Sequence, residues 1–388
     1  MDWRMVGRVV VGLLLALVGV AAARAQLQGH ISMAKNVYFA GEPVYVLFEY
    51  TNVGKDAVQY SMGDPYAEGC GGYKLEVSEK EAKGSANCKE PGANECIAGS
   101  EILAAGETRH QLILVNYAHD LSKAGNYEIR ATQEMKYAAA TGDVRLSATQ
   151  QQFKVEQRFT IQVVKADRER LEAIYKPYVV NLSSQDDEIQ REAERAIVSG
   201  APPWLEDTIV GMLRQYTSRE FALLGLKNLN TARSRAELAK IVQNTSEETD
   251  ENLTAVRYLA ELGDKKYFPM LLAIAKKEPA NEGREYVLAA AELGGDDAVP
   301  FLQEMLGSGD GAARANAVMG LGKTGSKAAV PLLIEALKDR ELGKLAGEGL
   351  VELTHRQVGD WATWWAGNSE SAAVFGAGEC DWKVEKGK

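Results

Sequence analysis

Three stretches, 262–272 (LGDKKYFPMLL), 293–302 (LGGDDAVPFL) and 321–333 (LGKTGSKAAVPLL), repeat one pattern in which a Leu-Gly pair precedes a proline and an apolar run. The prolines stand at positions 269, 300 and 331, so the period is 31 residues. A fixed period of this size is typical of stacked structural units. The sequence therefore predicts an α-solenoid over this region.

Each unit is predicted to contain two short helices. Gly263, Gly294 and Gly322 follow apolar runs, where a glycine in the left-handed conformation can end a helix. The proline that follows fits the first turn of the next helix, where its missing N–H costs little. Apolar residues recur at three-residue steps before each Leu-Gly pair, which indicates one buried helix face in each unit: Val256, Leu259 and Leu262; Val287, Ala290 and Leu293; Ala315, Val318 and Leu321.

These residues resemble the HEAT-repeat family, in the short bacterial form that also occurs in phycobilisome-lyase-type proteins. The resemblance covers residues from about 250 to about 355. It implies an all-α superhelix that is generally used to bind other proteins, with some enzymes among its members. It also favours a bacterial source.

The N-terminus has the pattern of a cleavable export signal. Arg4 and Arg8 precede an uncharged apolar run, and Ala23-Arg24-Ala25 supplies small residues at the two positions that a signal peptidase reads. The run is shorter than the roughly 20 residues needed to cross a bilayer, so an uncleaved anchor is the less favoured reading. We expect residues 1–25 to be removed and the product to be periplasmic or extracellular, with no further membrane span.

The charge of the chain argues against two classes of partner. The net charge is −10, and removal of the basic signal would make it −12. An acidic chain lacks the cationic excess on which general nucleic-acid binding depends, and it is poorly suited to anionic lipid surfaces.

Four cysteines remain after cleavage: Cys70, Cys88, Cys96 and Cys380. An even number in an exported chain favours disulfides, and three pairings are possible. A short Cys88–Cys96 loop would leave Cys70 to pair with Cys380. A zinc site is the rival reading, but no CxxC pair or neighbouring histidine supports it.

Residues 26–165 read as an antiparallel β-sandwich. Residues 44–50 are β-branched and aromatic, as in a largely buried strand, and Tyr73, Leu75 and Val77 alternate with charged residues, as in a half-buried strand. Residues 121–127 (LSKAGNY) resemble the tyrosine corner of immunoglobulin-like sandwiches, in which the phenol bonds back to its own loop.

Two features of this domain leave its role open. The opening 41–44 (GEPV) is similar to many bacterial envelope sandwiches and loosely similar to the bacterial intracellular proteinase-inhibitor family. The cysteine-bearing, Gly-rich insert 63–99 is either a functional loop or a stiffened decoration.

Residues 166–366 read as helices that follow the sheet without a Gly/Ser linker, so the two domains are expected to pack together. Asp167 is predicted to cap the first helix, and Ser183 or Ser184 the second. Trp361, Trp364 and Trp365 share a helix face and are read as a hydrophobic cap on the last repeat, with a ligand-stacking platform as the alternative. Residues 367–388 are expected to form a loose tail.

No catalytic constellation, metal site or cofactor motif is recognised. The histidines His30, His110, His119 and His355 stand apart, and none is followed by glutamate, which excludes the His-Glu iron chemistry of deoxyhypusine hydroxylase. Residues 322–324 (GKT) lack the remaining features of a phosphate-binding loop. His119-Asp120 is read as a loop pair and not as a dyad.

The sequence therefore predicts an exported, non-enzymatic protein-binding scaffold of two domains, all-β then all-α. Stacked repeats create a concave surface, and this surface is the expected site for a protein partner of unknown identity. One alternative makes the sandwich an inhibitor or a carbohydrate-binding module, with the solenoid as a spacer. A second alternative is a bilin-lyase-like enzyme, which an export signal disfavours. The oligomeric state stays open. The residues expected to face a partner are Arg257, Glu261, Leu288, Glu292 and Asn316.

Overall fold

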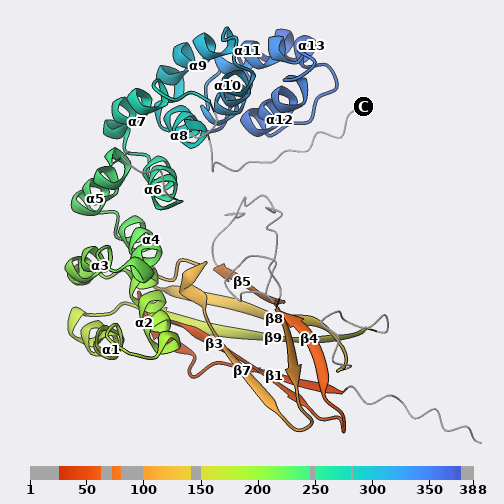
Figure 1. The fold of residues 1–388 in the computed structure, drawn as a ribbon, viewed down its shortest axis with the longest axis vertical. Helices are drawn as coiled ribbons and strands as arrows, with labels where there is room; N and C mark the ends of the chain where they lie inside the picture. The colour runs from red at the N-terminus through yellow and green to blue at the C-terminus, as the bar shows by residue number, and fades with distance from the viewer. Residues whose placement is uncertain are drawn as a thin grey trace, which may run out of the picture.

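The computed structural model describes residues 26–62, 72–79, 99–140, 150–244, 250–280 and 283–376. A β domain is followed by a curved row of helices that rises away from it and bends back above it (Figure 1). The mixed architecture, with β first and α second, is the one predicted from the sequence.

The β domain contains two sheets. In the described residues, one sheet has the order β1-β3-β7, and all of its pairings are antiparallel. The second has the order β2-β9-β8-β4-β6, with β5 paired to β8 and with β2 parallel to β9. The strand bounds are β1 Leu27–Ser32, β2 Val37–Phe39, β3 Tyr45–Asn52, β4 Val58–Met62, β5 Tyr73–Glu79, β6 Gly99–Leu103, β7 Thr108–Leu114, β8 Gly125–Ala139 and β9 Gln151–Val164.

Alternating residues of these strands form the core between the sheets. Val46, Phe48 and Tyr50 of β3 are buried, while the residues between them are partly exposed. The strand expected to be largely buried therefore buries one face, as a strand of a two-layer sandwich does. On β8, the Tyr127 hydroxyl donates to the Lys123 carbonyl oxygen at 3.0 Å, so the predicted tyrosine corner is confirmed.

Three residues separate the last strand from the first helix. Their bounds are α1 Arg168–Asn181, α2 Asp187–Gly200, α3 Glu206–Met212, α4 Arg219–Leu229, α5 Ala232–Gln243, α6 Asp250–Glu261, α7 Phe268–Ala275, α8 Arg284–Gly294, α9 Val299–Leu306, α10 Gly311–Lys323, α11 Ala329–Ala336, α12 Gly343–Thr354 and α13 Trp361–Asn368. The three period prolines all lie in the first turn of an outer helix, namely α7, α9 or α11. The inner helices α6, α8 and α12 lie on the concave side of the row (Figure 1).

The cap expected on the second helix is wrong. The N-cap of α2 is Asp186 and not Ser183 or Ser184. Asp186 has an extended backbone, and its carboxylate accepts hydrogen bonds from the Glu188 and Ile189 amides. Asp167 does cap α1, by accepting from the Arg170 amide at 2.9 Å. Ser184 instead accepts from the Asp186 amide, so it shapes the turn before the cap.

Two of the three predicted glycine helix stops are also wrong. Gly263 is left-handed, with φ +68°, but the left-handed glycines of the next two repeats are Gly295 and Gly325. Gly294 and Gly322 are instead helical and buried. A Cβ on Gly322 would lie 2.8 Å from the Gly349 Cα, so this glycine lets α10 and α12 approach closely.

The β domain and the solenoid are packed against each other. Tyr175 of α1 is 1 % exposed, and its hydroxyl donates to the Gly41 carbonyl oxygen at 2.7 Å. Nearby, the Asn116 side chain accepts from the Val44 amide and donates to the Glu42 carbonyl oxygen, which holds the loop that Tyr175 meets.

The end of the solenoid is closed by α13. Trp361 is buried in the solenoid core, and Trp364 and Trp365 pack against that core while partly exposed, as a hydrophobic cap requires. Part of the segment predicted to be a loose tail, as far as Gly376, contacts the solenoid. Gly376 forms a β-bridge with Thr324, and the Phe375 ring stacks on the His355 ring with centroids 4.2 Å apart.

Candidate functional site: the inner-face groove

A groove of about 680 Å³ crosses the inner helices near the end of the solenoid. It runs from α8 across α10 and α12 to α13, and these helices come from successive repeats. Its lining is Arg284, Leu288, Met319, Lys323, Lys344, Leu345, Gly347, Glu348, Gly349, Val351, Glu352, Gln357, Val358 and Trp361.

Equivalent positions of successive repeats meet in this groove. Leu288 of α8 and Met319 of α10 are one 31-residue period apart, and both line it. Lys323 of α10 also lines it, and its equivalent on α8 is Glu292. The groove is therefore a surface that the stacking of repeats creates, and no single repeat could form it.

Asn316 does not lie on this surface, contrary to the expectation from the sequence. It is 4 % exposed, and its side-chain amide donates to the Pro279 carbonyl oxygen at 3.0 Å, which ties α10 to the segment before α8. Asn316 is the counterpart of Leu288 only when the two helices are aligned on Gly294 and Gly322. Gly322 is not the helix stop, and the 31-residue spacing of Pro300 and Pro331 maps Leu288 to Met319 instead.

The other four residues predicted to face a partner do reach the surface to some degree. Arg257 is exposed and donates to the Thr254 hydroxyl at 3.1 Å, and Glu261 forms an ion pair with Lys227 of α4. Leu288 is half-buried and is the only one of the set among the groove-lining residues given above. Their role in binding stays a prediction.

Glu292 lies half-buried among charges from three neighbouring helices. Burial raises the pKa of its carboxyl, the Glu261 and Glu352 carboxylates raise it further, and Lys323 opposes them. No ion pair to Glu292 occurs among the described residues, whereas Lys323 binds Glu352 at 3.0 Å. Glu292 is therefore a carboxylate that its surroundings leave incompletely neutralised.

The sequence missed Met319, Lys323 and Trp361 as groove residues. The signal that identifies the first two was present, because the proline spacing of 31 residues maps Leu288 to Met319 and Glu292 to Lys323. No local pattern shows that Trp361 reaches the groove, since this depends on how α13 folds back over α12.

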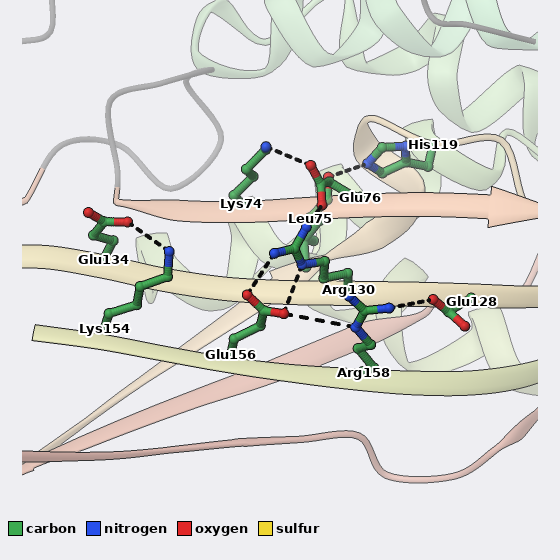
Figure 2. Close-up of polar contacts among 10 residues, drawn as sticks. All are labelled: Lys74, Leu75, Glu76, His119, Glu128, Arg130, Glu134, Lys154, Glu156 and Arg158. Atoms are coloured by element: carbon green, nitrogen blue, oxygen red, sulfur yellow. Dashed lines mark hydrogen bonds and ion pairs between the residues drawn. The ribbon is translucent and has the colours of Figure 1, made fainter.

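A network of charged side chains covers the outer face of β5, β8 and β9 (Figure 2). Arg130 donates two hydrogen bonds to Glu156, at 2.9 and 2.8 Å, and one to Glu76 at 3.1 Å. Hydrogen bonding from Arg130 lowers the pKa of Glu156, and hydrogen bonding from Lys74 is the main cause of the lowered pKa of Glu76. Exposed ion pairs of this kind keep a sheet face solvated and contribute little to stability.

His119 and Asp120 do not form a dyad. The His119 Nε2 atom lies 3.1 Å from the Leu75 carbonyl oxygen (Figure 2), while the Asp120 carboxylate accepts from the Ser122 amide. The described residues contain no group of three or more His, Cys, Asp and Glu side chains placed to hold a metal ion. Within the same ranges, no helix has the length and hydrophobicity that crossing a bilayer requires.

Several predictions fall outside the described residues. They are the export signal in residues 1–25, the cysteines Cys70, Cys88, Cys96 and Cys380 with their pairing, and most of the insert 63–99. They stay predictions.

Comparison with known families supports the assignment of the repeats. Residues 283–348, which run from the start of α8 into α12, match the family model of HEAT repeats. The helical part of this chain is a HEAT-like solenoid. No curated protein sequence matches the chain.

Three solved structures superpose distantly on this chain. The complex of CpcE and CpcF of phycocyanin lyase from Nostoc sp. is 18 % identical, covers 53 % of this chain and 85 % of that chain, and has a TM-score of 0.29. The alpha-2-macroglobulins of E. coli and Salmonella, the latter reacted with methylamine, are 10 % and 11 % identical, with TM-scores of 0.21 and 0.20. They cover 83 % and 90 % of this chain, which spans only 25 % and 27 % of their length. Superpositions at these scores carry no functional argument.

Proposed function

We propose that this protein is an exported, non-enzymatic scaffold that binds a protein partner in the inner-face groove of its HEAT-like solenoid. The observation that carries the proposal is the groove itself, which four consecutive elements of the inner row build. Its lining combines the apolar side chains of Leu288 and Met319, here called the apolar floor, with charged side chains. A mixture of this kind is typical of a protein-binding surface. The N-terminal pattern of residues 1–25 supports export.

The charges of the groove are suited to recognition. Lys323 pairs with Glu352 at 3.0 Å and Lys344 with Glu348 at 3.7 Å, so these four side chains mostly satisfy one another. Between them lie the half-buried side chains of Leu288 and Met319, which a partner can cover with apolar groups of its own. Binding energy is then expected to come from the apolar centre, and orientation from the charged edges.

A pair of arginines in the groove floor tests the proposal. Leu288→Arg combined with Met319→Arg should abolish crosslinked capture of the partner from an envelope fraction, because two cations replace the apolar floor. The matched control is Ala273→Arg combined with Gln303→Arg, since both residues are exposed on the outer helices α7 and α9. Equal melting temperatures would show that both variants fold.

Two fragments, 26–165 and 166–388, separate this proposal from the alternative in which the sandwich binds. The proposal requires that 166–388 capture the same protein as the full chain. Capture by 26–165 alone, or capture of a glycan, would move the site to the β domain.

A further inference from the structure

Two cations mark the edge of the groove at which the inner helices begin. Arg284 is the first residue of α8 and Lys344 is the second residue of α12, so both cations lie where the inner helices begin. At the opposite ends of these helices, the groove is lined by Lys323 and Glu352, which pair with each other at 3.0 Å. The partial charges of the helix ends add to the positive edge at the helix starts.

One of the cations that line the groove has no ion-pair partner among the described residues. Among the charged side chains that line it, Lys323 and Lys344 have carboxylate partners, whereas Arg284 is exposed and has no ion pair with any described residue. The chain as a whole is acidic, with a net charge of −10. The unpaired Arg284 beside the apolar floor therefore has the opposite sign to the net charge of the chain.

The apolar floor lies directly beside Arg284. Leu288 is one helical turn further along α8, and Met319 is its equivalent on α10. Val358 and the buried Trp361 add further apolar lining. A ligand side chain on Leu288 therefore lies within reach of the Arg284 guanidinium.

Building on the proposed function, we infer that the groove binds an amphipathic peptide segment in which carboxylates stand next to bulky apolar side chains. The apolar side chains cover Leu288 and Met319, and a carboxylate pairs with Arg284 in the geometry that guanidinium groups favour.

Three labelled peptides test this inference with the full chain. They share two leucines and a tryptophan and differ in the residues around them: Ac-GEELWEELG-NH2, Ac-GKKLWKKLG-NH2 and Ac-GQQLWQQLG-NH2, each with a fluorophore. Fluorescence anisotropy should give the acidic peptide a Kd about five- to tenfold below that of the glutamine peptide, and the lysine peptide should bind most weakly. The preference should shrink in high salt.

Variants of Arg284 test whether this residue causes the preference for the acidic peptide. Arg284→Glu should remove the preference for the acidic peptide, and Arg284→Lys should keep most of it. A glutamate at a helix start is favourable for the helix, so folding is preserved. Arg191→Glu is the matched control, because Arg191 is exposed on α2 and the charge change is the same.

The outcomes separate the inference from the proposed function. Equal binding of all three peptides, abolished by Leu288→Arg with Met319→Arg, would overturn the acidic preference and leave the groove as a binding site. An unchanged preference in Arg284→Glu would overturn the role of Arg284. If no peptide binds, or if binding ignores every groove variant, both the inference and the groove as a site for short segments fail.

Discussion

Single glycines serve two different purposes in the repeats. Gly295 and Gly325 take the left-handed conformation after a helix, where a side chain would be strained. Gly294 and Gly322 precede them inside the helices, where the lack of a side chain admits the Phe268 ring and the Gly349 backbone. The sequence shows the glycines but not their dihedral angles, so it could not assign the two purposes.

Gly322→Ala is expected to destabilise the solenoid by about 1–3 kcal/mol, because the new methyl group would force α10 away from α12. Gly347→Ala is the control. Its Cβ would meet only the Leu337 side chain, at 3.8 Å, so the higher helix propensity of alanine should stabilise it by up to about 1 kcal/mol. Urea unfolding of both variants measures the difference, and equal stabilities would contradict the packing role of Gly322.

The error at Asn316 had the same origin. If Gly322 ended the helix as Gly294 was expected to, the counterpart of Leu288 on α10 would be Asn316, which is three residues before Met319. The proline period, which is independent of the helix end, leads to Met319. Spacing between rigid first-turn residues was thus the better guide to equivalent positions in this array.

Whole elements were predicted more accurately than their ends. The spacing of apolar residues identifies the helices of the repeats, because each helix buries one face. The period prolines then mark which of these helices are the outer ones. The start of α2 was missed because Ser183, Ser184 and Asp186 are all good caps. Which of them acts depends on the turn that leaves α1, and composition alone does not determine that turn.

The row of charges across α6, α8, α10 and α12 predicts a pH effect. Since the folded protein raises the pKa of Glu292, protonation is favoured by folding, and this group's contribution to stability increases as pH falls through its folded pKa. Glu292→Gln should therefore raise the melting temperature at neutral pH, and the gain should vanish below the usual titration range of a carboxyl group. A gain that persists in acid would contradict this cause. Glu348→Gln, at the exposed groove edge, controls for the loss of one charge.

At the scale of the whole molecule, the joint between the domains holds the solenoid at a defined angle to the β domain (Figure 1). The sequence predicted contact there from the absence of a linker. It could not predict that Tyr175 of α1 would bond to Gly41, 134 residues earlier in the chain. Such a contact depends on the path of the intervening strands.

Gly200→Ala should loosen this joint. Its Cβ would lie 1.7 Å from the Tyr175 hydroxyl and 2.9 Å from the Gly41 carbonyl oxygen, and the buried tyrosine ring has little room to move. We expect a loss of about 1–3 kcal/mol and two calorimetric transitions in place of one. Tyr175→Phe removes only the hydrogen bond and should cost about 1 kcal/mol. One unshifted transition in Gly200→Ala would show that the joint does not couple the domains.

Site-specific photocrosslinking from the groove tests the central claim most directly. A benzophenone amino acid is placed at position 319 on α10, in the groove, and in a second protein at position 303 on the outer face of α9. If the inner-face groove is the binding site, the probe at position 319 should crosslink the same partner that the unmodified chain captures. The probe at position 303 should not crosslink it. A crosslink from position 303 alone, with none from position 319, would contradict it.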